Sequence, residues 1–289
     1  MSFGLPNPNH AAQAPVCPRH PDRISYVTCQ RCSRPACPDC QVSAAVGTQC
    51  VDCVRESNKQ IPTSRTVFGG KVTDGKPLVT YVLIAINAVV FGLQMMIPSF
   101  SDHLVYAGLY TSGYFEPEPW RMLTSTFAHS TTFIGHIAFN MYALYICGRV
   151  LEPMLGRLRF LALYLVAGLG GSVAVLLITD PRAPVLGASG AVFGLFAAMF
   201  VLLRSRGVQS MQIVILIAIN LVIGFIFPGI AWEAHVGGLV LGAAVAAVVA
   251  YSPKGNRRAL MQWVGIVLLV LLLAALTLYG AVNIRVPLG

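Results

Sequence analysis

The chain has 289 residues, of which 56% are hydrophobic and 11% charged, and its mean hydropathy is +0.69. Soluble domains carry about 25% charged residues, so this composition excludes an ordinary soluble protein and indicates one that crosses a membrane several times. The net charge of +9 does not indicate nucleic-acid binding, because the basic residues lie mostly in short loops without a basic groove or an aromatic platform. Residues 1–16 are polar and contain prolines, so we expect disorder there and no signal peptide.

Residues 17–54 hold seven of the eight cysteines and are predicted to form a small zinc-binding domain. The ligands form four closely spaced pairs: Cys17 with His20, Cys29 with Cys32, Cys37 with Cys40, and Cys50 with Cys53. Four pairs fit two tetrahedral zinc ions, and so short a segment buries too little apolar surface to fold without them. The favoured pairing is interleaved, with the first and third pairs on one ion and the second and fourth on the other. Sequential pairing is the alternative.

The two zinc ions are expected to be structural, because four protein ligands close each site. A redox dithiol is the alternative, although eight ligands exceed what thiol exchange needs. The interleaved pattern resembles B-box-type zinc fingers. Zinc modules of this size usually bind protein partners, so we expect the domain to recruit a substrate or a regulator. Self-association and a purely stabilising role are the other interpretations.

Residues 55–77 are polar and are predicted to be a linker at the membrane face. Seven apolar segments follow, each close to the roughly 20 residues that cross a bilayer. They span about 78–97, 133–151, 160–179, 188–203, 210–227, 232–251 and 261–282. The loops after the second, fourth and sixth segments are the more basic ones, which predicts a cytoplasmic N-terminus and an outside C-terminus in a bacterial-type cell membrane. The cysteines then lie in a reducing compartment, which favours metal over disulfides.

Ser189 and His235 lie near the starts of the fourth and sixth segments. Both segments run from outside to inside in the predicted topology, so the two side chains are expected at similar depth. Polar groups in hydrocarbon are costly and mark functional sites. A serine becomes a good nucleophile when a base takes its proton, and histidine is the usual base. The nearby acid, Glu233, is expected at the interface, so the pattern predicts a Ser–His dyad rather than a triad.

His136 and Asn140 stand four residues apart on one face of the second segment and are expected to line the same cavity. Their side-chain N–H groups, with the backbone N–H of Ser189, are predicted to stabilise the oxyanion formed in peptide hydrolysis. Gly187 and Gly190 let the backbone approach a substrate carbonyl.

Each motif also has a purely structural interpretation. The small residues around Ser189 are of the kind that membrane helices use for packing, and a lone histidine can form an interhelical hydrogen bond. Gly238 and Gly242 are expected to pack the sixth segment against the fourth. Catalysis is favoured because all four polar residues of the predicted site, the serine, the two histidines and the asparagine, are expected at the same depth in the membrane. Cys147, inside the second segment, is expected to be a buried packing residue.

The outer loop at about 98–132 is long for a membrane protein of this kind. It contains Trp120 and Arg121, which are natural anchors at the lipid headgroups, so the loop is expected to lie in the plane of the interface. An ordinary solvated loop is the alternative.

Together these motifs resemble the rhomboid intramembrane serine proteases over about residues 78–251. The matching residues are Trp120, Arg121, His136, Asn140, Gly148, Glu152, Gly156, Tyr164, Gly187, Ala188, Ser189, Gly190, Ala234, His235, Gly238 and Gly242. The resemblance implies an all-α polytopic membrane protein with a six-helix rhomboid core at 78–251. A cytoplasmic loop, a seventh transmembrane helix and a short tail would follow at 252–289.

The resemblance also implies the roles of the site residues. Ser189 would be the nucleophile and His235 the base, and His136 with Asn140 would form the oxyanion hole. His129 matches a structural histidine of the outer loop. Phe193 stands where members often have tyrosine, and its ring can still stack on the catalytic histidine. No cofactor is expected for catalysis.

The implied function is cleavage of single-pass membrane proteins within or next to their transmembrane segment, with the bilayer as the other partner. A pseudoprotease that captures membrane proteins without cutting them is one alternative, but such proteins typically lack the serine or the histidine. A transporter is another, and it predicts repeated halves and broken helices that this sequence does not display.

Overall fold

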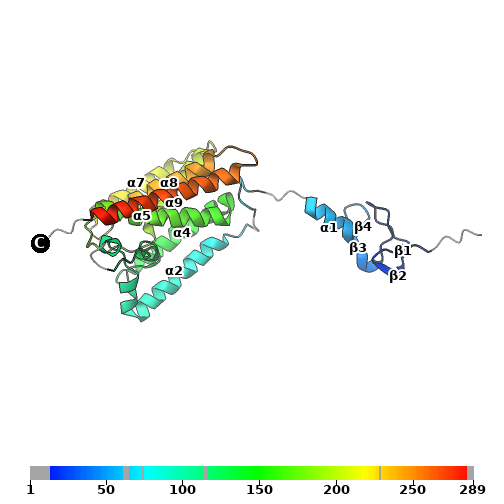
Figure 1. Ribbon diagram of the computed structural model, residues 1–289, viewed down its shortest axis with the longest axis horizontal. Helices are drawn as coiled ribbons and strands as arrows, with labels where there is room; N and C mark the ends of the chain where they lie inside the picture. Colours follow the sequence, from blue (N-terminus) through cyan, green and yellow to red (C-terminus); the bar gives the residue numbers. More distant parts are fainter. Residues whose placement is uncertain (1–13, 61–64, 73–74, 113–115, 228, 285–289) are drawn as a thin grey trace, which may run out of the picture. The chain divides into compact units, whose positions relative to one another are not determined.

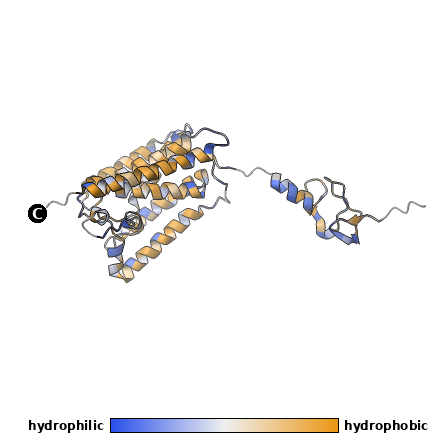
Figure 2. Cartoon of the chain, in the orientation of Figure 1, coloured by the Kyte–Doolittle hydropathy of each residue, from blue (hydrophilic) through white to orange (hydrophobic). Residues whose placement is uncertain are grey.

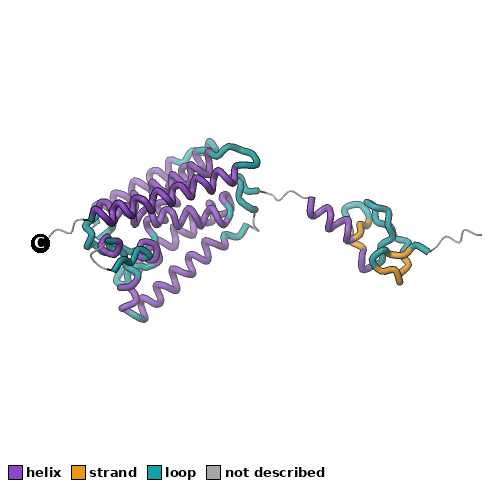
Figure 3. Tube along the Cα trace, in the orientation of Figure 1, coloured by secondary structure: helices purple, strands orange, loops and turns teal. Residues whose placement is uncertain are grey.

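The computed structural model describes residues 14–60, 65–72, 75–112, 116–227 and 229–284. The chain divides into two compact units, Met1–Thr63 and Ser64–Gly289. The first is a small mixed unit and the second is helical (Figures 1 and 3).

In residues 14–60, the first unit consists of two β-hairpins and one α-helix. β1 (Val16–Cys17) pairs antiparallel with β2 (His20–Ile24), and β3 (Gln41–Ser43) pairs antiparallel with β4 (Thr48–Cys50). A single turn, η1 (Pro38–Cys40), precedes β3, and α1 (Val51–Gln60) follows β4 directly. The buried core is Ala36 and six cysteines, so the interior of this unit consists mainly of potential metal ligands.

The boundaries of this unit differ from the predicted ones. β1 already includes Val16, within the segment expected to be disordered, while residues 1–13 lie outside the described part of the chain. At the other end α1 continues to Gln60, where a linker from residue 55 was expected. The helix continues because one of its faces packs against β3 and β4, a contact that the polar composition of this stretch does not reveal.

Among the described residues of the second unit, seven segments form long helices. They are α2 (Leu78–Met96), α4 (Ile134–Leu155), α5 (Arg157–Ile178), α6 (Ser189–Arg204), α7 (Met211–Ile226), α8 (Trp232–Tyr251) and α9 (Arg258–Asn283). Four of the described helices, α2, α5, α8 and α9, are long and apolar enough to cross a membrane, and α6 and α7 are apolar but shorter. Figure 2 shows their apolar colouring along nearly the whole bundle. The prediction of a helical, polytopic membrane protein is therefore confirmed.

α5, α6 and α8 form the centre of the bundle. The apolar stretch of α5 is 61% buried, against 17% for α9, which lies at the periphery. Peripheral helices expose large apolar side chains such as Val89 on α2, Ile219 on α7 and Leu268 on α9. An apolar surface of this extent suits contact with lipid. Cys147 is buried in the core of the bundle, as expected of a packing residue.

A buried carboxylate joins α4 to the start of α2. Glu152 is 2% exposed and accepts hydrogen bonds from the backbone N–H groups of Val79 and Thr80, at 2.9 and 2.8 Å, and from the Thr80 hydroxyl at 2.8 Å. The first N–H groups of a helix lack intrahelical partners, and a negative charge there is favourable. Gly148, one turn earlier on α4, leaves room for Thr80.

Part of the predicted linker is folded into the second unit. Residues Thr66–Gly70 form a tight turn in which the Thr66 N–H donates to the Gly70 carbonyl at 2.8 Å and the Gly69 N–H donates to the Thr66 carbonyl at 2.8 Å. Gly69 has a φ of +86°, which glycine adopts without strain. Phe68 at the tip is 3% exposed, and a Cβ on Gly70 would overlap the Leu155 carbonyl. We call residues 65–71 the plug.

Gln262 on α9 holds the plug in place. Its side chain is fully buried and donates to the carbonyl oxygens of Phe68 at 3.0 Å and Val249 at 2.9 Å. Its own oxygen accepts a hydrogen bond from Nε of Arg159 at 2.8 Å. The linker expectation is therefore wrong for residues 65–71, because burial of Phe68 and these hydrogen bonds offset the cost of ordering the chain.

Candidate active site

Ser189 and His235 meet between two helices. Ser189 is the first residue of α6, and His235 lies in the first turn of α8, 46 residues later. Nε2 of His235 lies 2.9 Å from Oγ of Ser189, and the histidine is 7% exposed. This is the separation at which an imidazole takes a proton from a hydroxyl.

The ring of Phe193 fixes the plane of the His235 imidazole. The two rings stack with centroids 4.2 Å apart and an angle of 10° between their planes. Phe193 stands one helical turn after Ser189 on α6, so the same helix supplies the hydroxyl and the ring. Nδ1 of His235 is buried and has no hydrogen-bond partner among the described residues. The arrangement is thus a pair, without a carboxylate behind the imidazole in the described part of the chain.

His136 lies close to the serine, on the other side of Gly187. Its Nδ1 accepts a hydrogen bond from the Ser130 N–H at 3.2 Å, so the neutral ring carries its proton on Nε2. A Cβ placed on Gly187 would lie 2.7 Å from that Nε2 and 3.8 Å from Oγ of Ser189. Gly187 has a φ of +130°, so glycine is required here both for its conformation and for space.

Asn140 and His129 surround His136. The Asn140 amide is 7% exposed and donates one N–H to the His136 carbonyl at 2.8 Å, which leaves its second N–H for another acceptor. The His129 ring is 1% exposed and packs against the His136 ring with centroids 5.1 Å apart. His129 therefore supports the position of His136 through packing.

Glycines bring α6 and α8 into backbone contact beneath the Ser–His pair. A Cβ on Gly238 would overlap the Gly190 carbonyl, and one on Gly242 would overlap Cα of Gly194. Small residues at such positions let helix backbones approach closely. The spacing between the hydroxyl and the imidazole therefore depends on these glycines.

Replacing Gly238 with alanine should separate α6 from α8, because the neighbouring atom is backbone and cannot rotate away. We expect a loss of about 1–3 kcal/mol in stability, the usual cost of overpacking, together with a loss of any activity that needs the pair at 2.9 Å. Thermal unfolding of the purified protein in detergent measures the first effect. Gly92→Ala on α2 is the matched control, since nothing lies within 4 Å of a Cβ there. Equal melting temperatures for the two variants would contradict the packing argument.

Comparison with known proteins identifies the architecture. The Rhomboid domain family model matches residues 116–252, which include both members of the pair. The putative rhomboid protease YdcA of Bacillus subtilis is 34% identical over 175 residues, which cover 57% of this chain and 85% of that protein. This chain belongs to the rhomboid family.

Two other rhomboid relatives are covered less completely. Rhomboid protease GluP of Bacillus subtilis is 35% identical over 210 residues, which are 70% of this chain and 40% of GluP. RHOMBOID-like protein 6, mitochondrial, of Arabidopsis thaliana is 33% identical over 146 residues, 48% of this chain and 46% of that protein. The chain therefore spans less than half the length of these two relatives.

In this rhomboid protein, the loop between α2 and α4 is stabilised by contacts of a buried arginine. Arg121 is 5% exposed, donates to Glu118 at 2.7 Å and lies 4.1 Å over the ring of Tyr110. Its guanidinium also donates to the carbonyls of Asp102 and Val105. The hydrogen bond from Arg121 lowers the pKa of the Glu118 carboxyl below its usual value.

The expectation that Arg121 anchors the loop at the headgroups is therefore wrong. Its charge is satisfied by Glu118, the Tyr110 ring and two carbonyls, so the side chain closes the loop on itself. The described part of this loop contains four short helices: η2 (Pro98–His103), η3 (Gly108–Thr111), α3 (Arg121–Thr124) and η4 (Ser125–Phe127). Trp120 remains 56% exposed.

The cysteine-rich unit lies outside the region matched by the Rhomboid model, and its described residues contain two candidate metal centres. One groups Cys17, His20, Cys37 and Cys40, and the other groups Cys29, Cys32, Cys50 and Cys53. Within each group the donor atoms lie within 4.8 Å of one another. The structure therefore groups the ligands in the interleaved arrangement and not in the sequential one.

The donor distances suit a tetrahedral ion. Nδ1 of His20 lies 3.2 Å from Sγ of Cys37, and the sulfurs of Cys32 and Cys50 lie 3.8 Å apart. Two thiolates on one zinc at about 2.3 Å stand about 3.8 Å apart in a tetrahedron. Backbone N–H donation from Cys37 lowers the pKa of Cys17, whereas burial and the neighbouring thiols raise the pKa of Cys40 in the same set.

Proposed function

We propose that this rhomboid-family protein is an intramembrane serine endopeptidase that cleaves single-pass membrane proteins within or next to their transmembrane segment. The observation that supports this most directly is the 2.9 Å contact between Nε2 of His235 and Oγ of Ser189 inside a helical bundle. The relatives named rhomboid proteases support the same activity.

The proposed reaction uses the chain's own groups. His235 takes the proton from Ser189 as the oxygen attacks the scissile carbonyl carbon. The negative charge that forms on the carbonyl oxygen is met by Nε2–H of His136, by the free amide N–H of Asn140, and by the backbone N–H of Ser189. His235 then gives the proton to the leaving amine. A water molecule, deprotonated by the same imidazole, releases the acyl group from Ser189.

We also propose that all seven long helices cross the bilayer, with the N-terminus in the cytoplasm and the C-terminus outside. The domain division that follows is a zinc-binding unit, a six-helix rhomboid core from α2 to α8, and α9 as an added seventh helix. In this orientation Ser189 and His235 lie in the outer half of the membrane. Because a helical peptide bond is shielded, substrates with small or helix-breaking residues near that depth are expected to be cut.

The zinc-binding unit is proposed to hold two structural zinc ions, one on each set of four ligands. The metal would supply folding free energy to the unit and take no part in peptide cleavage. Recruitment of a protein partner is the role we propose for it.

The test is cleavage of a fluorescent single-pass substrate in liposomes by wild type and Ser189→Ala. The substrate carries small residues and a helix breaker near its outer end. We expect product with wild type alone, and labelling of wild type alone by an alkyl fluorophosphonate, which reports the nucleophile without any substrate. Equal cleavage and labelling of Ser189→Ala would show that the serine mechanism is wrong.

A further inference from the structure

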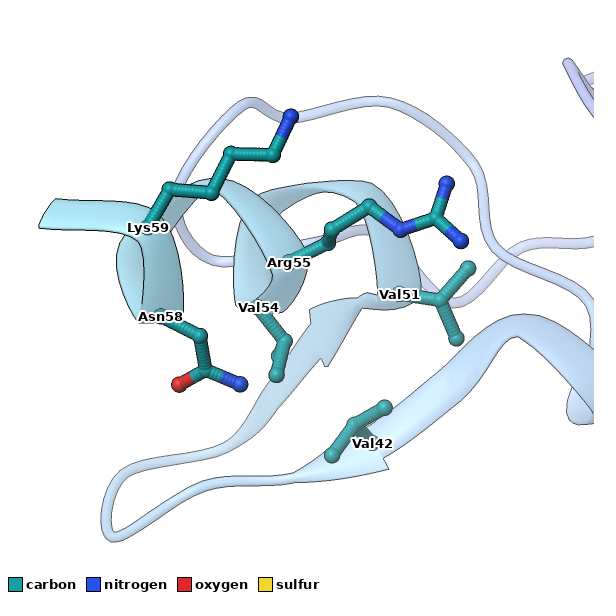
Figure 4. A pocket seen from close by; sticks show the side chains of 6 residues that line it. All are labelled: Val42, Val51, Val54, Arg55, Asn58 and Lys59. Atoms are coloured by element: carbon teal, nitrogen blue, oxygen red, sulfur yellow. The ribbon is translucent and has the colours of Figure 1, made fainter. Parts of the chain in front are cut away.

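A hollow of about 470 Å³ lies on the surface of the cysteine-rich unit, and none of its lining residues is a member of either metal-ligand set. It is lined by Val42 of β3 and, from α1, by Val51, Val54, Arg55, Asn58 and Lys59. In Figure 4, Val54 and Asn58 point from the helix toward the strand that carries Val42, and Arg55 and Lys59 extend from the same helix. We call this hollow the α1 groove.

The groove follows from the spacing of residues on α1. Positions 51, 54, 55, 58 and 59 recur at the interval that places side chains on one helix face. The valines stand in the first half of that face and the two cations in the second half. The valines are only partly buried, because the interior of the unit is filled by the metal-binding cysteines. An apolar floor therefore remains open beside two cationic side chains.

The two cations of the groove differ from the other arginines of this unit. Arg19 pairs with Asp52 at 3.1 Å, Arg23 pairs with Asp39, and Arg34 donates to Cys32 at 3.3 Å. Within residues 14–60 the structure gives Arg55 and Lys59 neither an ion pair nor a side-chain hydrogen bond. Their charges are therefore free to meet carboxylates brought by a ligand.

We propose that the α1 groove binds a short acidic and apolar peptide segment on the cytoplasmic tail of the membrane protein to be cleaved. Eight residues of helix separate Val51 from Lys59, which is about 12 Å, and an extended chain covers that distance in about four residues. The expected motif has two apolar residues over the valines followed by two carboxylates at Arg55 and Lys59. This proposal rests on the proposed protease function, because the tail belongs to the substrate.

Other occupants fit the groove less well. Residues 1–13 of this chain contain no aspartate or glutamate, so they offer nothing to the two cations. An anionic membrane surface selects clusters of four to eight lysines or arginines, as a rough rule. Residues 14–60 contain six basic and four acidic residues, so the unit as a whole is not a basic cluster of that kind. The positive charge that could bind an acidic ligand is confined to the groove.

The first experiment measures binding of a fluorescent Leu-Val-Glu-Glu peptide to the zinc-loaded, full-length protein by anisotropy. The charge-reversed variant Arg55→Glu/Lys59→Glu should bind it about tenfold more weakly or worse. The charge-conserving variant Arg55→Lys/Lys59→Arg and the neighbouring Glu56→Gln should bind it like wild type. A Leu-Val-Gln-Gln peptide should bind weakly to all forms. Zinc content is measured for each variant so that loss of folding is not counted as loss of binding.

The second experiment separates this proposal from the protease function. One single-pass substrate carries the acidic motif on its cytoplasmic tail and a matched one carries the glutamine version. Wild type should cleave the acidic form with a severalfold lower KM and an unchanged kcat, and Arg55→Glu/Lys59→Glu should cleave both forms alike. If wild type cleaves both forms equally, or charge reversal leaves peptide binding unchanged, the groove proposal is overturned while the protease stands. If neither substrate is cut although the peptide binds as expected, the protease function has failed and the groove has not.

Discussion

Replacing His235 with alanine should lower kcat/KM for a single-pass substrate by about 10⁴-fold or more. The imidazole at 2.9 Å is the base within reach of Oγ, and without it Ser189 stays a neutral, weak nucleophile. Nδ1 of His235 has no hydrogen-bond partner among the described residues, so the proposed base acts without an orienting carboxylate. The measurement is the initial rate of cleavage in liposomes against substrate concentration.

Phe193→Leu is the matched comparison for His235→Ala. It removes the ring stacked at 4.2 Å but leaves the hydroxyl and the imidazole in place. We expect a loss of roughly tenfold, since the stack orients the base and does not transfer the proton. Thermal unfolding of both variants shows whether the bundle is intact. Cleavage by a folded His235→Ala protein at more than a tenth of the wild-type rate would refute the dyad.

Removing zinc should unfold the cysteine-rich unit and leave the membrane unit folded. The interior of the small unit is made of ligands, and structural zinc contributes about 10–16 kcal/mol of apparent binding free energy in comparable peptides. Chelation of the full-length protein should therefore make residues 14–60 sensitive to protease while the membrane fragment survives. Protection that persists after complete removal of zinc would contradict a metal-dependent fold.

Zinc content also distinguishes the two pairings. With interleaved sets, Cys17→Ala/Cys40→Ala damages one site and should leave one zinc, whereas Cys17→Ala/Cys32→Ala damages both. Sequential pairing predicts the opposite result for each double variant. Cys147→Ala, in the core of the membrane unit, is the control and should keep two zinc ions. The count is made by elemental analysis of purified protein.

The sequence could predict those parts of the site that depend on a regular pattern, such as apolar segments of membrane-spanning length or closely spaced pairs of cysteines. Ser189 and His235 were expected at similar depth because two apolar segments run in the same direction, and the structure brings them together. The Cys-x-x-Cys spacing likewise indicates shared ligands, since a tight turn holds both thiolates on one ion. Their roles in catalysis and zinc binding stay predictions.

The sequence could not predict those parts that depend on contacts with backbone groups or with residues distant in the chain, because no sequence pattern marks such contacts. Ser130 orients His136 through its backbone N–H, which any residue type supplies. The internal role of Arg121 follows from carbonyls and a ring that only the folded loop assembles. Gln262 could have been suspected, because a polar side chain near the start of an apolar segment is costly unless it is bonded. Its partner, Phe68, lies 194 residues away, which no spacing rule connects.

That hydrogen bond has a consequence for how the protein is made. The plug is synthesised before any of the long helices, and α9 is synthesised after all the others. The hydrogen bond between Gln262 and Phe68 therefore cannot form until the whole bundle has been made. A contact of such long range forms late in folding. In a chain halted before α9, the carbonyl of Phe68 would lack the donor that Gln262 supplies, and Arg159 would lack its acceptor.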